Sequence, residues 1–470
     1  MSVRLSWFKS YDIRGTVPDQ VNAEAVYRIA RAIAAWSGAG EILVGRDGRL
    51  SSPSLAESLM EGLLVSGVTV LDTGMVTTPM LNYAVARFER YGLMITASHN
   101  PKEYNGIKLI DPGVEQVYYG RGLEAVEELV LKNRFGKRKG GGKILMRPVL
   151  QDYEDYLAGR FGDAKFPPFS VVVDCSNGVG GLPLRVLERL GIAHAALYHV
   201  PDGNFPNHGC DTLRPENLRR LQAEVKRRKA GLGIMFDGDS DRVAFVDERG
   251  ETAPLDMVFV LLARQELAMR KGRVFHDLRF SRVVKEEVER AGGIPVMLRV
   301  GNPFHKEALH RYADALLAAE LSGHIMYKEH FGIDDPLFAS LKLLSCLAGS
   351  GENLSRQLRP LKRYAGSGEI RIEAADPRAL GEKARSRFGD GSLSKVDGIT
   401  VRYADWWFNL RPSNTEPVVK LVIEADSAQL LERRKADLLD FIASEGGTVE
   451  PPDAAAGGRR AKRKREGASR

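Results

Sequence analysis

Short apolar runs and longer amphipathic stretches alternate along the first 145 or so residues. The runs 42–44, 68–71 and 92–95 have the length and composition of buried strands. Between them apolar residues recur every three or four positions, which predicts a helix over 23–36 and another opened by a capping box at Ser54. This alternation is typical of a parallel sheet whose strands are joined by crossover helices.

The same layout returns twice further along the chain. Strand-like runs at 170–174 and 231–236 belong to one such segment, and runs at 273–276 and 294–298 to the next. After about residue 362 the pattern changes to period-two alternation with two helices, which indicates antiparallel sheet. We therefore expect an α/β protein with three related mixed α/β domains, a smaller C-terminal α+β domain and a tail, at 1–145, 146–253, 254–361, 362–450 and 451–470.

Length and cysteine usage restrict the class of protein. No apolar run in the 470 residues approaches the ~20 needed to cross a bilayer, and the N-terminus lacks the apolar core of a secretory signal. Cys175, Cys210 and Cys346 are widely spaced and form no Cys-x-x-Cys pair, which argues against a disulfide framework and a zinc site. These features predict a cytoplasmic protein without a membrane partner.

The basic balance is concentrated at one end of the chain. The net charge is +7, and the last twenty residues hold seven basic and two acidic side chains, so they carry five of these charges. The body is nearly neutral, which argues against nucleic-acid binding by the folded part. The tail is expected to be disordered. It is expected to act mainly as a solubility segment, and its partner, if it has one, is not defined by the sequence.

Ser98 is the first candidate for covalent chemistry. It follows the strand-like run 92–95 within Thr-Ala-Ser-His-Asn-Pro, so it should emerge on a turn beside His99. A serine needs a neighbouring acid–base group or a metal to become a nucleophile or phosphate carrier. An isolated turn of this composition has no necessary chemistry, and the interpretation depends on four other stretches.

The strongest of these is Asp-Gly-Asp-Ser-Asp-Arg at 237–242. Three carboxylates, Asp237, Asp239 and Asp241, come directly off a strand at alternate positions and can converge on one hard divalent cation. Arg242 stands where an EF-hand requires glycine, so a calcium loop is a poor match. Three protein oxygens leave open positions on the ion, which suits Mg²⁺ bound to a phosphate.

The other three stretches supply groups suited to phosphate and sugar. Arg411, Ser413, Asn414 and Thr415 form a compact cradle for an oxyanion. Glu320, Ser322 and His324 lie on a glycine-bearing turn and suit the hydroxyls of a sugar. Tyr11 and Arg14 near the start, with Lys108 after the serine, add cations for phosphoryl charge or proton transfer.

Taken in order, these motifs resemble the α-D-phosphohexomutase superfamily, and most closely its phosphomannomutase/phosphoglucomutase branch. The resemblance runs from about Phe8 to Glu424. It implies a heart-shaped molecule of four domains around a central cleft, with a mobile fourth domain. It also implies an isomerase of carbohydrate metabolism that interconverts hexose 1- and 6-phosphates, mannose and glucose, with Mg²⁺ and a hexose 1,6-bisphosphate activator.

Carried over to this chain, the resemblance assigns a role to each candidate. Ser98 would be the phosphoserine and would hold Mg²⁺ together with Asp237, Asp239 and Asp241. The groups around the transferring phosphoryl would be Arg14, His99, Lys108 and Arg242. The substrate would be held by Tyr11, Glu320, Ser322, His324, Arg411, Ser413, Asn414 and Thr415.

Three positions bear on the substrate. The family loop Gly-His-Ser reads Gly301-Asn302-Pro303 here, and the usual lysine nearby is Arg279. Leu321 favours the mannose/glucose branch, because the glucosamine branch usually has glutamine there. Phosphoglucosamine mutase is nevertheless an alternative, and so are a metal-dependent sugar phosphatase and a non-catalytic sugar-phosphate sensor.

Overall fold

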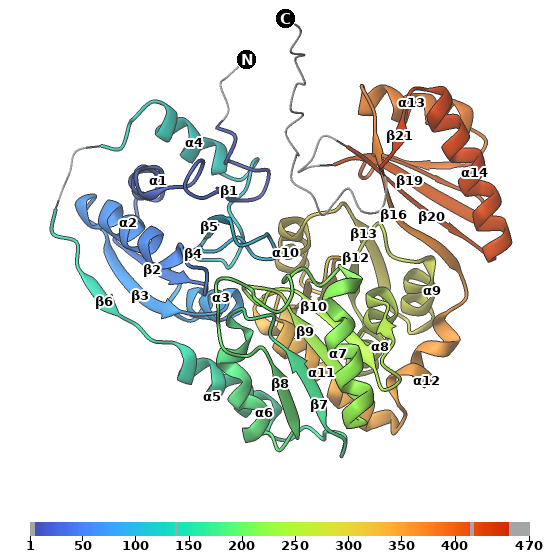
Figure 1. Ribbon diagram of the computed structural model, residues 1–470, viewed down its shortest axis with the longest axis horizontal. Coiled ribbons are helices and arrows are strands. Elements are labelled where there is room, and N and C mark those ends of the chain that lie inside the picture. The colour runs from blue at the N-terminus through green and yellow to red at the C-terminus, as the bar shows by residue number, and fades with distance from the viewer. Residues whose placement is uncertain (1–4, 137–139, 414–417, 451–470) are drawn as a thin grey trace, which may run out of the picture. The chain divides into compact units, whose positions relative to one another are not determined.

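The computed structural model describes residues 5–136, 140–413 and 418–450. The chain divides into two compact units, Met1–Lys362 and Arg363–Arg470. The first unit contains three sheets and the second unit contains one (Figure 1). The expected disordered tail, 451–470, lies outside the described residues.

The first sheet confirms the predicted mixture of parallel strands and crossover helices. Its strand order is β1-β5-β4-β2-β3-β6. Strands β4, β2, β3 and β6 run parallel, whereas β5 is antiparallel to β4 and to β1. The elements are β1 (Ile13–Thr16), α1 (Ala23–Ser37), β2 (Glu41–Arg46), α2 (Ser52–Val65), β3 (Thr69–Met75), α3 (Thr78–Phe88), β4 (Tyr91–Ile95), β5 (Tyr104–Ile110), α4 (Leu123–Leu131) and β6 (Ile144–Met146).

Helices pack on this sheet because alternate strand residues point to opposite sides. Leu93 and Ile95 of β4 share one core with α1, α2 and α4. On the other side α3 lies so close to Gly92 that an added Cβ would be 2.5 Å from Val85. Glycine at this position therefore sets the approach of α3 to the strand that ends in front of Ser98.

The start of α2 differs from the capping box predicted at Ser54. The helix begins at Ser52, and its N-cap Ser51 makes no side-chain capping bond. The Ser54 hydroxyl instead donates to the Ser51 carbonyl. The signal was misleading because Ser52 is used in tertiary contacts described below, and because Pro53 suits the first turn of a helix.

The second and third sheets follow the same plan. Their strand orders are β11-β10-β9-β7-β8 and β13-β12-β14-β15. The elements of this region are α5 (Leu150–Phe161), β7 (Val171–Asp174), η1 (Val179–Leu184), α6 (Arg185–Arg189), β8 (His194–Leu197), α7 (Pro215–Arg228), β9 (Leu232–Phe236), β10 (Val243–Asp247), β11 (Thr252–Ala253), α8 (Leu255–Met269), β12 (Arg273–Asp277), α9 (Arg282–Arg290), β13 (Ile294–Leu298), α10 (Asn302–Arg311), β14 (Ala315–Ala319), β15 (Ile325–Tyr327), η2 (Lys328–His330), α11 (Pro336–Ser350), α12 (Leu354–Leu358) and η3 (Arg359–Leu361).

The three sheets present their candidate loops in the same way. In each, a strand of the parallel part is followed by a strand that pairs with it antiparallel: β4 by β5, β9 by β10, and β14 by β15. The loops between these pairs carry Ser98, the three aspartates, and Glu320 with Ser322. The repeated layout expected from the sequence thus includes the position of the chemistry.

The second unit has the antiparallel sheet expected for a smaller α+β domain. Its strand order is β17-β18-β19-β20-β16-β21, and neighbouring strands pair antiparallel among the described residues. Helices α13 and α14 cover one face and share a core with the sheet (Figure 1). The elements are β16 (Ala365–Glu373), α13 (Pro377–Arg387), β17 (Ser392–Ser394), β18 (Ile399–Arg402), β19 (Trp406–Pro412), β20 (Val419–Ala425), α14 (Ala428–Ser444) and β21 (Thr448–Val449).

Among the described residues, the longer helices are too polar or too short to span a bilayer.

Candidate active site

Ser98 lies on a sharp turn directly after β4. Its backbone has φ of 51°, in the left-handed region, and the residue is 1% exposed. The hydroxyl Oγ donates to Asp237 Oδ2 at 2.8 Å and lies 3.5 Å from Asp241 Oδ1. The nucleophile predicted from one domain thus reaches the acidic loop of the next.

The three aspartates of the acidic loop form a buried cluster. One oxygen from each of Asp237, Asp239 and Asp241 lies within 4.8 Å of the others. Asp239 Oδ1 is buried and has no hydrogen-bond partner among the described residues. A buried carboxylate oxygen without a donor is costly unless a cation binds it. The donor set, three carboxylates beside a hydroxyl, therefore fits Mg²⁺.

The pKa values of two aspartates in this cluster are shifted in opposite directions. Burial, followed by repulsion from Asp241 and Asp239, raises the pKa of Asp237 well above its usual range. Burial also acts to raise the pKa of Asp241, but attraction to Lys108 and His324 outweighs it and lowers that pKa to about 2. Besides burial, the raised pKa of Asp237 reflects repulsion among the three carboxylates, which a bound cation would relieve.

Lys108 extends from β5 into the same cluster. Its Nζ lies 2.6 Å from Asp239 Oδ2 and 2.5 Å from Asp241 Oδ2. Burial acts to lower the pKa of this ammonium group, but the two carboxylates outweigh it and raise the pKa above its usual value. Lys108 is therefore a cation at neutral pH rather than a base.

His99 and Arg14 lie on the other side of the serine. His99 Nδ1 is 3.3 Å from Ser98 Oγ. Burial, with the positive charges of Arg242 and Arg14, lowers the pKa of His99 well below its usual value, so its imidazole is neutral at pH 7. Arg14 donates to Asn100 Oδ1 at 2.9 Å and pairs with Asp12, while its Nε is buried without a partner among the described residues.

Arg242 is oriented by a buried chain of polar side chains. Its Nε donates to His324 Nε2 at 3.1 Å, so the ring proton of His324 is on Nδ1, which faces Asp334 Oδ2 at 3.1 Å. Asp334 is also 2.6 Å from Lys306 Nζ. Burial opposes ionisation of Asp334, but Lys306 and His324 outweigh it and hold its pKa well below the usual range.

The predicted sugar loop is buried and partly free to bind. Glu320 Oε1 accepts a hydrogen bond from Arg279 Nη2 at 3.2 Å, and Arg279 also pairs with Asp277. The Ser322 hydroxyl is buried without a partner among the described residues. This arrangement leaves Ser322 and one oxygen of Glu320 as hydrogen-bonding groups for a ligand.

The two departures from the family pattern are both integrated into this site. Asn302 Nδ2 donates to Asp334 Oδ2 at 2.5 Å, and its Oδ1 is buried without a partner among the described residues. Gly301 has φ of 136°, and an added Cβ there would lie 2.8 Å from the Tyr11 hydroxyl. Tyr11 donates to the Val300 carbonyl at 3.1 Å, which ties the N-terminal segment to this loop.

The predicted oxyanion cradle belongs to the second unit. Arg411 lies on β19, is 2% exposed, and its Nη2 donates to Glu369 Oε2 at 2.6 Å. The other oxygen of Glu369 lies 2.8 Å from Lys420 Nζ. Arg411 Nε is buried without a partner among the described residues, and Ser413 continues the chain after β19. Asn414 and Thr415 lie outside the described residues.

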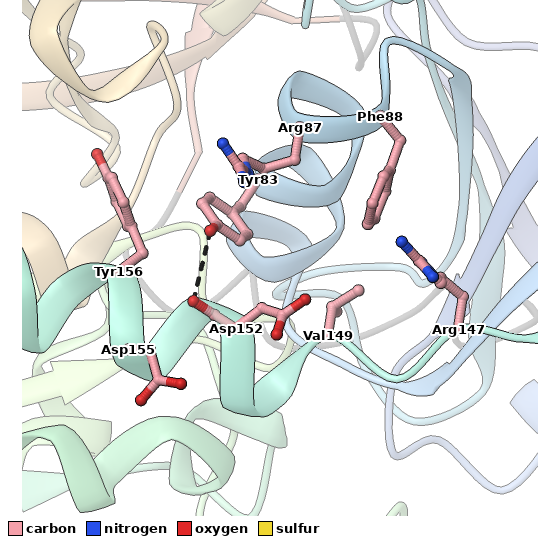
Figure 2. Close-up of a pocket in the computed structure, with 8 residues that line it drawn as sticks. All are labelled: Tyr83, Arg87, Phe88, Arg147, Val149, Asp152, Asp155 and Tyr156. Carbon is pink, nitrogen blue, oxygen red and sulfur yellow. Dashed lines mark hydrogen bonds between the residues drawn. The ribbon is translucent and has the colours of Figure 1, made fainter.

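A separate pocket of about 480 Å³ lies between α3 and α5, and none of the predicted site residues line it. Figure 2 shows Tyr83 of α3 near Asp152 and Tyr156 of α5, and Phe88, at the end of α3, beside Arg147. The Tyr83 hydroxyl donates to the Asp152 carbonyl at 3.4 Å. The N-terminus of α3 is at the acidic loop, so this pocket lies towards the opposite end of the helix.

The structure adds residues to the site that the sequence did not single out. Thr78, the first residue of α3, donates from Oγ1 to Asp239 Oδ2 at 2.6 Å. Asp334 and Lys306 support His324, as described above. No local pattern in the sequence connects these residues with partners far away in the chain.

Comparison with known proteins gives the same picture. Residues 6–132, 151–250 and 254–364 match the alpha/beta/alpha domains I, II and III of the phosphoglucomutase/phosphomannomutase family, and 369–441 match its C-terminal domain. The phosphomannomutase/phosphoglucomutase of Pseudomonas aeruginosa is 38% identical over 441 residues, which are 92% of this chain and 94% of that protein.

Solved structures agree. The crystal structure of a phosphoglucomutase/phosphomannomutase family protein from Burkholderia thailandensis aligns with a TM-score of 0.87 at 33% identity, covering 95% of this chain and 100% of that chain. An N-acetylphosphoglucosamine mutase from Aspergillus fumigatus, solved in complex with glucose 1,6-bisphosphate, has the same fold, with a TM-score of 0.61 at 16% identity over 95% of this chain and 96% of that chain.

Three α/β domains with a serine against an acidic loop, followed by an antiparallel C-terminal domain, define a phosphohexomutase. The chain belongs to the phosphoglucomutase/phosphomannomutase family. The resemblance inferred from the motifs is thereby confirmed, and the protein is an isomerase. The four-domain fold is confirmed, whereas the exact domain boundaries stay predictions.

Proposed function

We propose that this enzyme interconverts hexose 1-phosphates and hexose 6-phosphates of mannose and glucose, with Ser98 as the phosphate carrier. The observation that carries the proposal is the 2.8 Å hydrogen bond from Ser98 Oγ to Asp237 inside a buried trio of carboxylates. A serine hydroxyl without a chemical role would not be expected to lie buried against three carboxylates. Asp237, Asp239 and Asp241, with the phosphate on Ser98, would hold Mg²⁺, which neutralises phosphoryl charge when bound.

The reaction consists of two phosphoryl transfers. In the first, the bond between phosphorus and Ser98 Oγ breaks while a bond forms to O6 of a hexose 1-phosphate, giving the 1,6-bisphosphate. In the second, the intermediate presents its other end, and the phosphate on O1 returns to Ser98. Both steps depend on alignment and on charge neutralisation more than on covalent chemistry by the protein.

The surrounding side chains have proposed roles in proton and charge control. Neutral His99, whose Nδ1 is 3.3 Å from Ser98 Oγ, suits acceptance of the proton from the attacking sugar hydroxyl. Lys108 stays protonated between two carboxylates and suits donation to the departing oxygen. Arg14 and Arg242 suit stabilisation of the charge on the transferring group.

Two sets of residues are proposed to bind the substrate. Glu320, Ser322 and His324, with Tyr11, would hold the sugar hydroxyls and orient the ring. The distal phosphate would bind to Arg411, Ser413, Asn414 and Thr415. A hexose 1,6-bisphosphate would act as activator by phosphorylating Ser98. We also propose a cytoplasmic location.

The proposal is tested by a phosphorus NMR time course with Mg²⁺ and a trace of bisphosphate. Mannose, glucose and glucosamine 1-phosphates compete in one tube. We expect mannose and glucose 6-phosphates to appear without free phosphate, and Ser98→Ala to abolish the conversion. If glucosamine 6-phosphate is the only product, the mechanism is retained but the proposed substrates are rejected. Release of free phosphate would indicate a phosphatase, and binding without conversion would indicate a sensor.

A further inference from the structure

Arg49 is fully used by hydrogen bonds although it lies outside every predicted site. It occupies the turn between β2 and α2 and is 1% exposed. A guanidinium group has five N–H donors, and here each has an acceptor. Nε bonds Asp47 Oδ2 at 3.1 Å, and the four remaining donors bond the main-chain carbonyls of Pro101 and Tyr104 (Nη1, 2.7 and 3.0 Å) and of Ser98 and Asn100 (Nη2, 2.7 and 2.7 Å).

These four carbonyls belong to one loop, the one that presents Ser98. Ser98 has φ of 51°, a backbone conformation that is unfavourable for a residue with a Cβ and persists only where its surroundings hold it. The bond from Arg49 to the Ser98 carbonyl fixes the peptide plane after Ser98, and the hydroxyl of the same residue donates to Asp237.

Arg49 is itself held rigidly. Asp47 accepts both the backbone N–H and the Nε–H of Arg49, at 3.0 and 3.1 Å, and Ser52 Oγ donates to the same carboxylate at 2.5 Å. The guanidinium carbon lies 5.2 Å from the centre of the Phe205 ring, which belongs to the segment after the second sheet's β8. Arg49 is therefore held both by the Asp47 carboxylate and by contact with the Phe205 ring.

The Ser98 carbonyl is also in contact with the acidic loop. An added Cβ on Gly238 would be 2.6 Å from the Ser98 oxygen, and the Cys210 thiol donates to the same oxygen at 3.6 Å. A shift of the serine turn would therefore displace its hydroxyl and press on the loop of the three aspartates. Among the described residues, Arg49 makes no hydrogen bond or ion pair with Glu320, Ser322 or His324 of the predicted sugar loop.

We propose that Arg49 is a positioning residue that holds the Ser98 loop in register with the acidic loop through these four carbonyl bonds. The proposal rests on Ser98 as the phosphate carrier. Because Arg49 acts behind the nucleophile and does not touch substrate, its loss affects the chemical step and leaves substrate binding unchanged. A displacement of about 1 Å in such a site costs on the order of 100-fold in rate.

The test is steady-state kinetics of Arg49→Lys, with the amount of phosphorylated Ser98 measured by mass spectrometry. Lysine keeps the charge but has three donors on one atom and cannot span four carbonyls. We expect kcat per phosphorylated enzyme to fall by about 100-fold and KM to change less than about twofold. The phosphorus NMR signal of the phosphoserine should also shift.

Arg28→Lys is the matched control. Arg28 belongs to the same domain, and its Nη2 donates to the Val130 carbonyl of α4 at 2.9 Å, away from the serine loop. It should leave kcat and the phosphoserine signal unchanged. Wild-type enzyme in the same assay separates the two proposals, because absence of turnover there would reject the proposed function rather than the role of Arg49.

A second variant covers the case in which Arg49→Lys does not fold. Asp47→Asn keeps the guanidinium but weakens its anchor, and we expect a loss in kcat of about 10-fold with KM retained. In Arg49→Ala, added ethylguanidinium should restore part of the rate, whereas ethylammonium should not. Unchanged kcat per phosphorylated enzyme in Arg49→Lys or Asp47→Asn, or a loss that follows only the folded fraction, would overturn the proposal.

Discussion

At the scale of single residues, the part of the site that could be predicted from the sequence is the part formed by short contiguous motifs. The functional groups of two motifs are close together in the sequence: Ser98 is next to His99, and the three aspartates stand at alternate positions. Thr78 and Asp334 form no such motif with their partners, because Thr78 meets Asp239 161 positions away and Asp334 meets Lys306 only after folding. Arg49 belongs with them, since its four carbonyl partners are some fifty residues further along.

Arg411 gives a direct test of the oxyanion cradle. If Arg411 binds the distal phosphate as proposed, Arg411→Ala removes a charge-assisted hydrogen bond of roughly 1.5–3 kcal/mol, so we expect KM to rise about 10- to 100-fold with a smaller change in kcat. Lys420→Met, which removes the neighbouring cation held by the same carboxylate, should raise KM less. An unchanged KM in Arg411→Ala, measured with hexose 1-phosphate, would reject the cradle.

The cysteines should be chemically silent in the folded enzyme. Burial raises the pKa of Cys175 well above its usual value, that of Cys210 to about 12 and that of Cys346 to about 11, although Arg264 partly opposes the last shift. Since the thiolate is the reactive form, iodoacetamide at pH 8 should label the three only after unfolding in urea. Rapid labelling of native enzyme, detected by mass spectrometry, would contradict this, and Cys346 should react first if any does.

At the scale of elements, the helix predicted over 23–36 is observed as α1, Ala23–Ser37. Strand positions were also predicted well, because the sheets are buried and their strands are continuous apolar runs. Helix α10 was not predicted, since it begins with Asn302-Pro303 and is rich in polar and basic residues. Asn302, where the sequence departs from the family pattern, is the first residue of this helix.

Helix α3 allows stability and metal binding to be separated. Thr77 caps the helix by accepting from the Met80 N–H, whereas Thr78 donates to Asp239. Thr77→Ala should cost about 1 kcal/mol of unfolding free energy and leave the Mg²⁺ dependence of activity unchanged.

Thr78→Val should have the opposite pattern. Without the hydroxyl, Asp239 loses a donor that orients its carboxylate, so we expect the Mg²⁺ concentration for half-maximal activity to rise about 10-fold at similar thermal stability. Titration of activity with Mg²⁺ and a thermal melt of both variants decide the matter. Equal effects of the two substitutions on both measurements would reject the division of labour.

At the scale of the whole molecule, buried ion pairs join segments that are distant in sequence. Asp277 at the end of β12 pairs with Arg279, which also reaches Glu320 across the third domain. Burial acts to raise the pKa of Asp277, but Arg279 and backbone donors outweigh it and lower the pKa to about 2. A depressed pKa means that the ionised pair stabilises the fold above the unfolded value near ~4 and loses this contribution as the pH falls towards 2.

This pair predicts part of the acid sensitivity of the enzyme. Between pH 5 and 2 the wild type should lose about 2 kcal/mol of stability that Asp277→Asn does not lose, measured by urea unfolding at several pH values. Asp314→Asn, in an exposed pair with Arg273, is the control and should follow the wild type. Parallel pH curves for Asp277→Asn and the wild type would reject the assignment.

Glu369 has a further consequence for how the enzyme releases what it binds. Its carboxylate occupies both Arg411 and Lys420, one oxygen for each cation. A phosphate group that binds Arg411 has to compete with this resident anion, so its observed affinity is the difference between two ion pairs rather than the strength of one. The Glu369 carboxylate returns whenever the phosphate leaves, which shortens the dwell time of each encounter. Under the proposed mechanism, this suits an intermediate that has to be released and bound again in the opposite orientation.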